Sequence, residues 1–396
     1  MSRRNKEYVI YAAEMFPRHF CVKRFFKDMI LAVSAYICVR EKKRAGPMKY
    51  LMKIRKGIIA EGILILALVA VLCRQEGQEQ DDMTAESNIQ VSATGDYIKW
   101  VDFKVSYEAL CRAYDWDIKT HGSETELHWI ELLAYAAAKT GGDVDKDACK
   151  YIDAAAKKLT EENTAIRDLT KDLEYYPYYL QAYSAVLDGF VGEYEAELPD
   201  ETGGTKWEKV YGLKAFSPVA KGFYYEDYDD FGASRSYGYA RPHLGHDMMG
   251  QVGTPIIAIE SGTVEALGWN QYGGWRIGIR SHDKKRYYYY AHLRQNYPYA
   301  DWLEEGCEVT AGDVIGYMGH TGYSTKENVN NIEVTHLHWG LELIFDESQK
   351  ESNNEIWIDV YALTQFLYKN RSEVVKVEGT KEWVRVYGLR EMENNE

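Results

Sequence analysis

One long apolar run stands out in the pattern of hydrophobic and polar positions, at residues 57–73. It reads G-I-I-A-E-G-I-L-I-L-A-L-V-A-V-L-C and contains a single acidic residue, Glu61. This length lies at the short end of the range for a transmembrane helix. The pattern therefore predicts one membrane-spanning helix in this segment.

The charges on either side of this run predict its orientation. Residues 40–56 hold eight basic side chains, whereas residues 74–96 are polar and rich in acids. By the positive-inside rule, residues 1–56 form a basic cytoplasmic segment and the rest of the chain lies outside the cell. A cleaved signal peptide and a lipid on Cys73 are less favoured alternatives, because no small residue precedes this cysteine. A start of the protein at Met48 is a further alternative.

Helical periodicity dominates the middle of the chain, after a polar linker at 74–96. In residues 124–139 the apolar side chains recur with the spacing of one helix face, and Gly141 follows as a stop signal. Further helices are predicted at 106–114, 146–159, 160–173 and 178–193. Together these segments predict an all-α domain at 97–199, followed by a second linker at 200–230.

The last part of the chain has the short alternating segments that are typical of β-strands. Such segments lie at 256–259, 262–267, 275–280 and 287–292. They predict a mostly antiparallel β domain at 231–346, followed by a C-terminal helix and tail at 347–396. The helix is expected at 356–370. Two similar segments, 206–213 and 382–389, flank the β domain and are expected to pair as strands or to pack on the same kind of groove.

The predicted fold class is therefore multidomain, with an N-terminal membrane anchor, an all-α middle domain and a C-terminal antiparallel β domain. Charge divides the chain in the same way. The formal net charge is −14, to which residues 1–73 contribute +10 and residues 74–396 contribute −24. So acidic a region excludes nucleic acid as a partner, because phosphate binding requires basic side chains. The predicted location is the cell membrane, single-pass, with the N-terminus cytoplasmic and the β domain extracellular.

The candidate chemistry is concentrated in the β region, where seven of the ten histidines lie between residues 243 and 338. His336 and His338 are two positions apart, so on a strand both imidazoles point to one face. His243 and Asp247 are four positions apart, on one helix face or, given the proline and glycine beside them, across a turn. His292 ends a tyrosine-rich strand. Imidazole and carboxylate are ligands of zinc, so these residues predict a metal site.

The order of these motifs resembles the lysostaphin-type (LytM-like) zinc endopeptidases, which cut the peptide part of bacterial peptidoglycan. The resemblance covers residues 241–345. The matching segments are H-L-G-H-D at 243–247, G-T-P at 253–255, S-G-T-V at 261–264, Y-A-H-L at 290–293, G-D-V-I-G at 312–316, G-H-T-G at 319–322 and H-L-H at 336–338.

The resemblance implies a zinc-lined groove and a role for each residue in it. It implies that His243, Asp247 and His338 hold Zn²⁺, and that His292 and His336 are the catalytic pair beside the metal. It also implies peptidoglycan peptides as substrate, either stem peptides or cross-bridges, cut by metal-activated water. Which of the two catalytic histidines acts as the base stays open.

Two departures from the family pattern fall in this region. His246 stands where the family usually has an aliphatic residue, and it either replaces a ligand or points away from the site. The loop at 323–335 is longer than the usual link and is expected to reshape one wall of the groove.

Two other functions stay open. Domains of this type also serve as scaffold or binding proteins, which implies envelope or sporulation proteins as partners. A bifunctional wall hydrolase is the second alternative, because Glu124, Glu126 and Glu131 lie close to His128 in the helical region and a glycosidase needs two carboxylates. The simpler interpretation is favoured, in which these side chains are solvent-exposed charges on one face of a helix.

Overall fold

The computed structural model describes most of the chain from residue 100 onwards. The residues outside the description are 1–99, 163, 237–239, 351–354 and 393–396. The chain divides into two compact units, Met1–Gln90 and Val91–Glu396, and every described residue belongs to the second.

The predicted membrane localisation does not stand. In the part of the chain that the structure describes, none of the helices has both the length and the apolar character needed to cross a bilayer. This finding contradicts the prediction of a single-pass protein with a cytoplasmic N-terminus. The segments behind that prediction, namely the basic segment 1–56, the apolar run 57–73 and the linker 74–96, lie outside the described residues.

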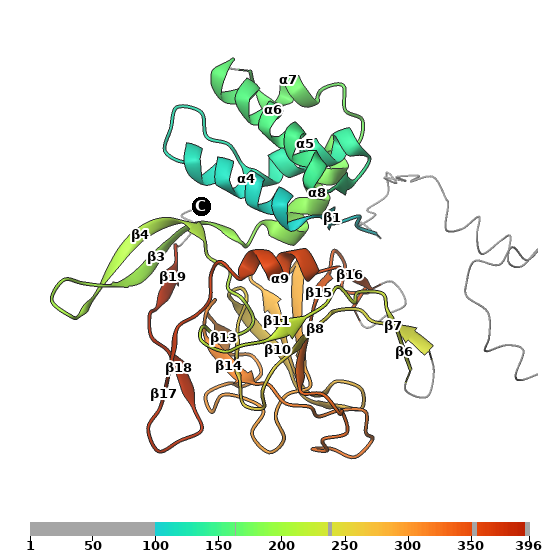
Figure 1. Ribbon diagram of the computed structural model, residues 1–396, viewed down its shortest axis with the longest axis vertical. Helices are drawn as coiled ribbons and strands as arrows, with labels where there is room; N and C mark the ends of the chain where they lie inside the picture. Colours follow the sequence, from blue (N-terminus) through green and yellow to red (C-terminus); the bar gives the residue numbers. More distant parts are fainter. Residues whose placement is uncertain (1–99, 163, 237–239, 351–354, 393–396) are drawn as a thin grey trace, which may run out of the picture. The chain divides into compact units, whose positions relative to one another are not determined.

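A group of helices forms the first part of the described chain (Figure 1). Their bounds are α4 Tyr107–Thr120, α5 Trp129–Thr140, α6 Cys149–Glu161, α7 Ile166–Thr170 and α8 Tyr176–Leu187, with a 3₁₀ turn at Lys146–Ala148. Two short parallel strands, β1 (Lys104–Val105) and β2 (Asp143–Val144), lie beside them. The helix α4 begins where the Ser106 hydroxyl accepts a hydrogen bond from the Ala109 amide, and α5 ends at Gly141 in the left-handed conformation.

The end of this helical group differs from the prediction. The helix expected at 178–193 stops at Leu187, and the strand β3 begins at Val191. The chain leaves the helix here because Val191 already pairs as a strand residue with Leu213. Gly189, between the two elements, packs closely on the β region, where an added Cβ would lie 1.8 Å from the Glu260 carboxylate.

The predicted linker at 200–230 also contains regular structure. The strands β3 (Val191–Pro199), β4 (Thr205–Leu213) and β19 (Leu389–Glu391) form one antiparallel sheet in the order β19-β3-β4. The β3–β4 turn is fixed by Asp200, whose Oδ1 accepts hydrogen bonds from two backbone amides of the turn at 2.8 Å each. Within the described sheets the similar segments 206–213 and 382–389 do not pair with each other, because β3 lies between β4 and β19.

The antiparallel β architecture predicted for the C-terminal region is confirmed. A mostly sequential antiparallel sheet has the strand order β13-β10-β11-β12-β15-β8-β5, and β16 also pairs with β15. The bounds are β5 Glu226–Asp227, β8 His246–Met249, β10 Gly262–Asn270, β11 Gly274–Ser281, β12 Arg286–Ala291, β13 Glu308–Val309, β15 His336–Leu343 and β16 Ile356–Ile358. Smaller two-stranded sheets are β6 Ser234–Ser236 with β7 Ala240–Pro242, β9 Pro255–Ile257 with β14 Val314–Tyr317, and β17 Val374–Lys376 with β18 Trp383–Arg385.

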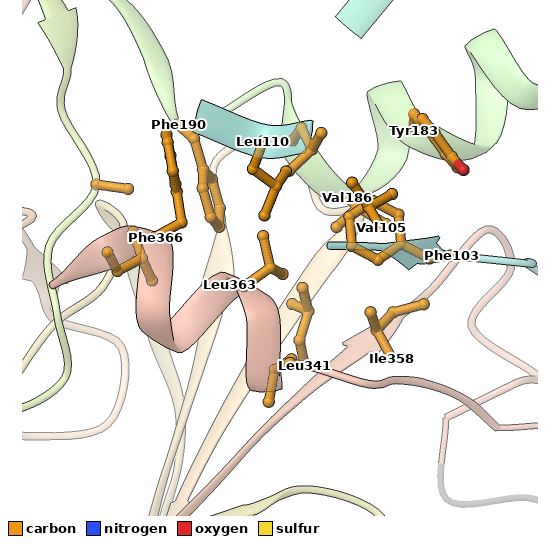
Figure 2. Packing of buried hydrophobic residues seen from close by; sticks show 14 of the residues in the cluster. Phe103, Val105, Leu110, Tyr183, Val186, Phe190, Leu341, Ile358, Leu363 and Phe366 are labelled. Atoms are coloured by element: carbon orange, nitrogen blue, oxygen red, sulfur yellow. The ribbon is translucent and has the colours of Figure 1, made fainter. Parts of the chain in front are cut away.

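The C-terminal helix is shorter than the predicted 356–370. Its first residues form β16 instead, and α9 runs only over Tyr361–Leu367. Figure 2 shows α9 in contact with both neighbouring layers, with Leu363 between Leu110 of α4 and Leu341 of the sheet. In the same layer the Phe366 ring stacks on Trp129 of α5 at 5.6 Å between centroids. The helical group is therefore packed on the sheet through α9.

Alternation along the strands decides which side chains face the helices. On β15, Trp339 donates a hydrogen bond to the Thr364 hydroxyl of α9, and Leu341 lies in the same core. His336 and His338 occupy the alternate positions, so they project from the opposite face of the sheet. The candidate chemistry thus lies on the face that α9 does not cover.

Candidate metal centre

Strand pairing brings the first two candidate ligands together. β15 pairs antiparallel with β8, and the register places His338 directly opposite Asp247. Directly opposite residues share a face of the sheet. His243 precedes β8 and completes the group, which is the one cluster of at least three His, Cys, Asp or Glu ligand atoms found among the described residues.

The three facing atoms form an almost equilateral triangle. His243 Nε2 lies 3.0 Å from Asp247 Oδ1 and 2.9 Å from His338 Nδ1, and the remaining side measures 3.0 Å. Two ligands of a tetrahedral zinc site with bonds of about 2.05 Å are separated by about 3.3 Å. The donor atoms present therefore fit a zinc ion after only a small expansion of the triangle.

A glycine makes the close approach of these residues possible. A Cβ added at Gly245 would lie 2.5 Å from His338 Cε1 and 2.8 Å from the Trp339 carbonyl oxygen. Because one of these atoms is a backbone oxygen, rotation of a side chain alone could not make room for the new Cβ. Gly245 thus lets the chain turn between His243 and Asp247 while His338 occupies the space behind it.

A second layer of side chains orients the ligands. The His243 Nδ1–H faces two acceptors of Asp230, the carbonyl oxygen at 3.1 Å and the carboxylate at 3.2 Å, so in a neutral ring Nε2 carries a lone pair. Arg235 donates to the carboxylates of Asp230 at 2.6 Å and Asp247 at 3.2 Å. It therefore fixes Asp247 Oδ2 and leaves Oδ1 for the triangle. Neither Asp230 nor Arg235 was among the predicted site residues.

The protonation states of the group suit a cation. Burial raises the pKa of Asp247, but the contacts of its carboxylate with the rings of His243 and His338 outweigh this effect and hold the pKa well below its usual range. Burial lowers the pKa of His338 despite its bond to Asp247. Asp247 is consequently ionised at neutral pH and His338 is neutral, which are the forms that bind metal.

The other two predicted residues lie beside the triangle. The His292 ring is 4.7 Å from the His336 ring and 5.8 Å from the His338 ring, between centroids. The Nδ1–H of His292 donates to the Thr321 carbonyl at 2.9 Å, and that of His336 donates to the Val334 carbonyl at 2.8 Å. Since a carbonyl oxygen only accepts, each neutral ring keeps an unprotonated Nε2.

The surroundings keep His292 neutral. Burial and the nearby His336 and His338 lower the pKa of His292 well below its ordinary value. Its backbone has a φ of 62°, a left-handed conformation that is uncommon for a residue with a side chain. The backbone amide is held by the Gly273 carbonyl at 2.7 Å, so this strained residue is fixed in place.

His246 does not join the group. It lies one position before Asp247 on β8 and therefore faces the other side of the sheet. Its Nε2 contacts Asp227 at 3.1 Å, and its ring packs against Tyr361 of α9. Burial lowers the pKa of His246, but its bonds to Asp227 and Asp230 prevail and raise that pKa to about 9. Of the two alternatives for this residue, the geometry favours the one in which it points away.

The triangle opens into a cleft of about 950 Å³. Its floor is built from the outward side chains of β11, β12 and β15, and the loop after Gly322 contributes Tyr323 and Val334 to its wall. The long loop at 323–335 thus reaches the cleft, and whether it reshapes the wall stays a prediction. It is tied to β11 by Asn328, whose Oδ1 accepts a hydrogen bond from the Trp275 indole at 2.9 Å.

Known proteins resemble this chain in the same region. Residues 241–354 match Peptidase family M23. The chain is 32% identical over 173 residues to an L-Ala–D-Glu endopeptidase of Bacillus subtilis, a match that covers 41% of this chain and 52% of that protein. It is 38% identical over 90 residues to lysostaphin of Staphylococcus simulans, over 22% of this chain and 17% of that protein. The chain therefore spans about half the length of the first relative and less than a fifth of the second.

Two solved structures match different shares of the chain. A LytM of Ruminococcus gnavus is 23% identical, with a TM-score of 0.45, over 70% of this chain and 94% of the other. The catalytic domain of lysostaphin from Staphylococcus simulans is 28% identical, with a TM-score of 0.28, over 36% of this chain and 92% of that domain.

Proposed function

Since residues 241–354 make this chain a member of the lysostaphin-type M23 peptidases, we propose that it is a zinc metalloendopeptidase that hydrolyses peptide bonds of bacterial peptidoglycan. The observation that carries the proposal is the meeting of three lone-pair atoms, on His243, Asp247 and His338, next to two histidines with an unprotonated Nε2. The names of the relatives, an L-Ala–D-Glu endopeptidase and lysostaphin, support a peptide substrate from the cell wall.

In this proposal His243 Nε2, Asp247 Oδ1 and His338 Nδ1 hold the metal. A zinc ion bound there would act as a Lewis acid and make water nucleophilic near neutral pH. Arg235 and Asp230 keep the ligand atoms aimed at one point. Three protein ligands leave one position open to the cleft, which is the arrangement of catalytic rather than structural zinc sites.

His292 and His336 would move protons beside the metal. In the neutral form of either ring Nε2 is the acceptor, and the His336 Nε2 lies 3.7 Å from Asp247 Oδ1, at the edge of the triangle. One of the two would take the proton of the attacking water. The imidazolium formed in this way would deliver that proton to the leaving amine, and the other histidine, when protonated at Nε2, would stabilise the developing negative charge on the carbonyl oxygen.

The proposal is tested with the full chain loaded with zinc and incubated with peptidoglycan. Released fragments are identified by mass spectrometry, beside a His336→Ala control at equal zinc content. Fragments that the wild type releases and the variant does not would support a peptidase and name the bond. Equal release by both, or none by a zinc-loaded wild type, would contradict the proposal.

The two alternatives make different forecasts. A scaffold protein would bind zinc and a partner protein without turnover. A glycosidase in the helical region would release reducing sugar ends. Among its candidate residues, Glu124 and Glu126 are exposed, and the Glu126 carboxylate accepts a hydrogen bond from the Gly122 amide at 2.7 Å. This hydrogen bond favours a structural role for Glu126 in the local turn.

A further inference from the structure

The charged side chains of the cleft do not balance one another. Among its lining residues, Arg235 is paired with Asp230 and Asp247, and Lys350 is paired with Glu265. Two further arginines, Arg241 and Arg276, line the cleft without a carboxylate partner among the described residues. The described lining also includes the carboxylates Glu342 and Glu355, so its lysine and arginine side chains outnumber its carboxylates by four to three, whereas the chain as a whole has a formal net charge of −14.

Arg241 is held between two aromatic rings next to the histidines. Its guanidinium carbon lies 5.0 Å from the Tyr272 ring centre and 5.8 Å from that of Tyr323, and it donates to the Tyr323 hydroxyl at 3.3 Å. The Tyr323 ring is 6.1 Å from the ring of His292. The buried Nε of Arg241 has no hydrogen-bond partner among the described residues. The aromatic contacts fix the orientation of the planar group but do not neutralise its charge.

Arg276 lies on the floor of the cleft. It is two positions before Gly278, which pairs with Tyr289, so the side chains of Arg276 and Tyr289 share a face of the sheet. Tyr289 packs edge-on against His338 at 5.9 Å between ring centres. Gly278, on the same strand as Arg276, makes room for the Tyr287 hydroxyl, which lies 1.9 Å from the position that a Cβ would take. The buried Nε of Arg276 also lacks a hydrogen-bond partner.

We infer that Arg241 and Arg276 bind carboxylates of the substrate, so that the cleft selects acidic peptides over uncharged ones. A fixed guanidinium matches a carboxylate with two parallel hydrogen bonds, and such charge-assisted bonds are stronger than neutral ones. This inference rests on the proposed function and specifies its substrate class. In peptidoglycan it favours stem peptides with free carboxylates and disfavours cross-bridges built from glycine alone.

The test uses two stem-peptide fragments that differ at one group, a glutamate carboxylate that is free in one and amidated in the other. Values of kcat/KM for the zinc-loaded full chain are compared between them. The wild type is expected to prefer the free acid by about tenfold to a hundredfold, the effect of one charge-assisted hydrogen bond. Arg241→Gln and Arg276→Gln should each reduce this preference, and Arg241→Lys should retain part of it.

The control is Arg167→Gln, which removes the same charge from an exposed position on α7. It should leave the ratio of the two kcat/KM values unchanged. A merely structural role of the cleft arginines would lower both rates and leave the ratio as it is. Equal rates for the two fragments in the wild type, or an unchanged ratio in both cleft variants, would overturn the inference.

Binding separates this inference from the proposed function. The affinity of each fragment for the wild-type chain and for the two cleft variants is measured by calorimetry under conditions without turnover. Tighter binding of the free acid that Arg241→Gln weakens would support carboxylate recognition even if no fragment is ever cleaved. Equal affinity of acid and amide would overturn it even if peptidoglycan is cleaved.

Discussion

Two side chains behind the candidate ligands, Asp230 and Arg235, determine where the ligand atoms point. Asp230 holds the Nδ1–H of His243, and Arg235 occupies the second carboxylate oxygen of Asp247. Such outer partners commonly contribute a factor of about 10 to 100 to metal affinity. The site is therefore a two-layered structure, in which the metal would depend on residues that never touch it.

At this scale we expect Asp230→Ala to weaken zinc binding about 10- to 100-fold, because His243 loses the carboxylate that fixes its ring. Competition with a chromogenic chelator measures the affinity. Asp168→Ala, at an exposed position of α7, is the matched control and should bind zinc as the wild type does. Unchanged zinc affinity in Asp230→Ala would show that this second layer has no energetic role.

The motifs of the sequence led to all five central residues, and the structure brings all five together, although their individual roles stay a prediction. Asp230, Arg235 and the cleft arginines were not predicted. They lie in segments without a spacing rule of their own, and their position depends on long-range contacts such as the one between Arg235 and Asp247. Unpaired charge can be recognised only when all neighbours are known.

At the scale of elements, the β8–β15 pair is the frame of the site, and the turn that enters it requires glycine. We expect Gly245→Ala to reduce zinc affinity at least about tenfold and to destabilise the fold by about 1–3 kcal/mol, because the new Cβ would overlap His338 and a backbone carbonyl. Zinc titration and urea unfolding measure both effects.

The matched control is Gly192→Ala on β3, where the nearest atom would lie 3.9 Å from the new Cβ. This variant should retain zinc binding. If Gly245→Ala behaves like Gly192→Ala, the close packing of the turn against His338 would not be a requirement of the site.

Some elements could be predicted from local pattern and others could not. The tyrosine-rich strand expected at 287–292 is found as β12 (Arg286–Ala291), because tyrosine has a high β-propensity and suits both the buried and the cleft-facing side of the strand. The β3–β4 hairpin as such was not predicted, because the helix expected at 178–193 extends into β3 and β4 falls in the predicted linker, although 206–213 was considered a possible strand. Its sheet includes β19, from the other end of the chain, and that pairing has no local signal.

At the scale of the whole molecule, a buried ion pair joins the helical group to the sheet. The Arg286 guanidinium donates to Glu260 at 2.8 and 3.0 Å and to the Ala185 carbonyl of α8 at 2.9 Å, and the Tyr288 hydroxyl donates to the same carboxylate. We expect Glu260→Gln to lower the free energy of unfolding by up to about 3–5 kcal/mol, because the buried Arg286 would keep only the partly exposed carboxylate of Asp283 as a counter-charge.

Urea unfolding measures this cost. The control is Glu193→Gln, which removes one partner of the exposed pair with Lys209 and should cost at most about 1 kcal/mol. Equal effects of the two substitutions would mean that the buried pair is no more important than a surface one. No local charge pattern indicates this pair, because Glu260 and Arg286 come together only in the folded molecule.

The central claim is that His243, Asp247 and His338 hold zinc for a reaction that His292 assists. The most direct test measures zinc content and release of peptides from peptidoglycan on the same samples of wild type, His292→Ala and His338→Ala. The wild type should have both zinc and turnover, His292→Ala should keep zinc but lose turnover by a factor of at least about 100, and His338→Ala should lose both. A zinc-loaded His292→Ala protein with undiminished turnover would contradict the account.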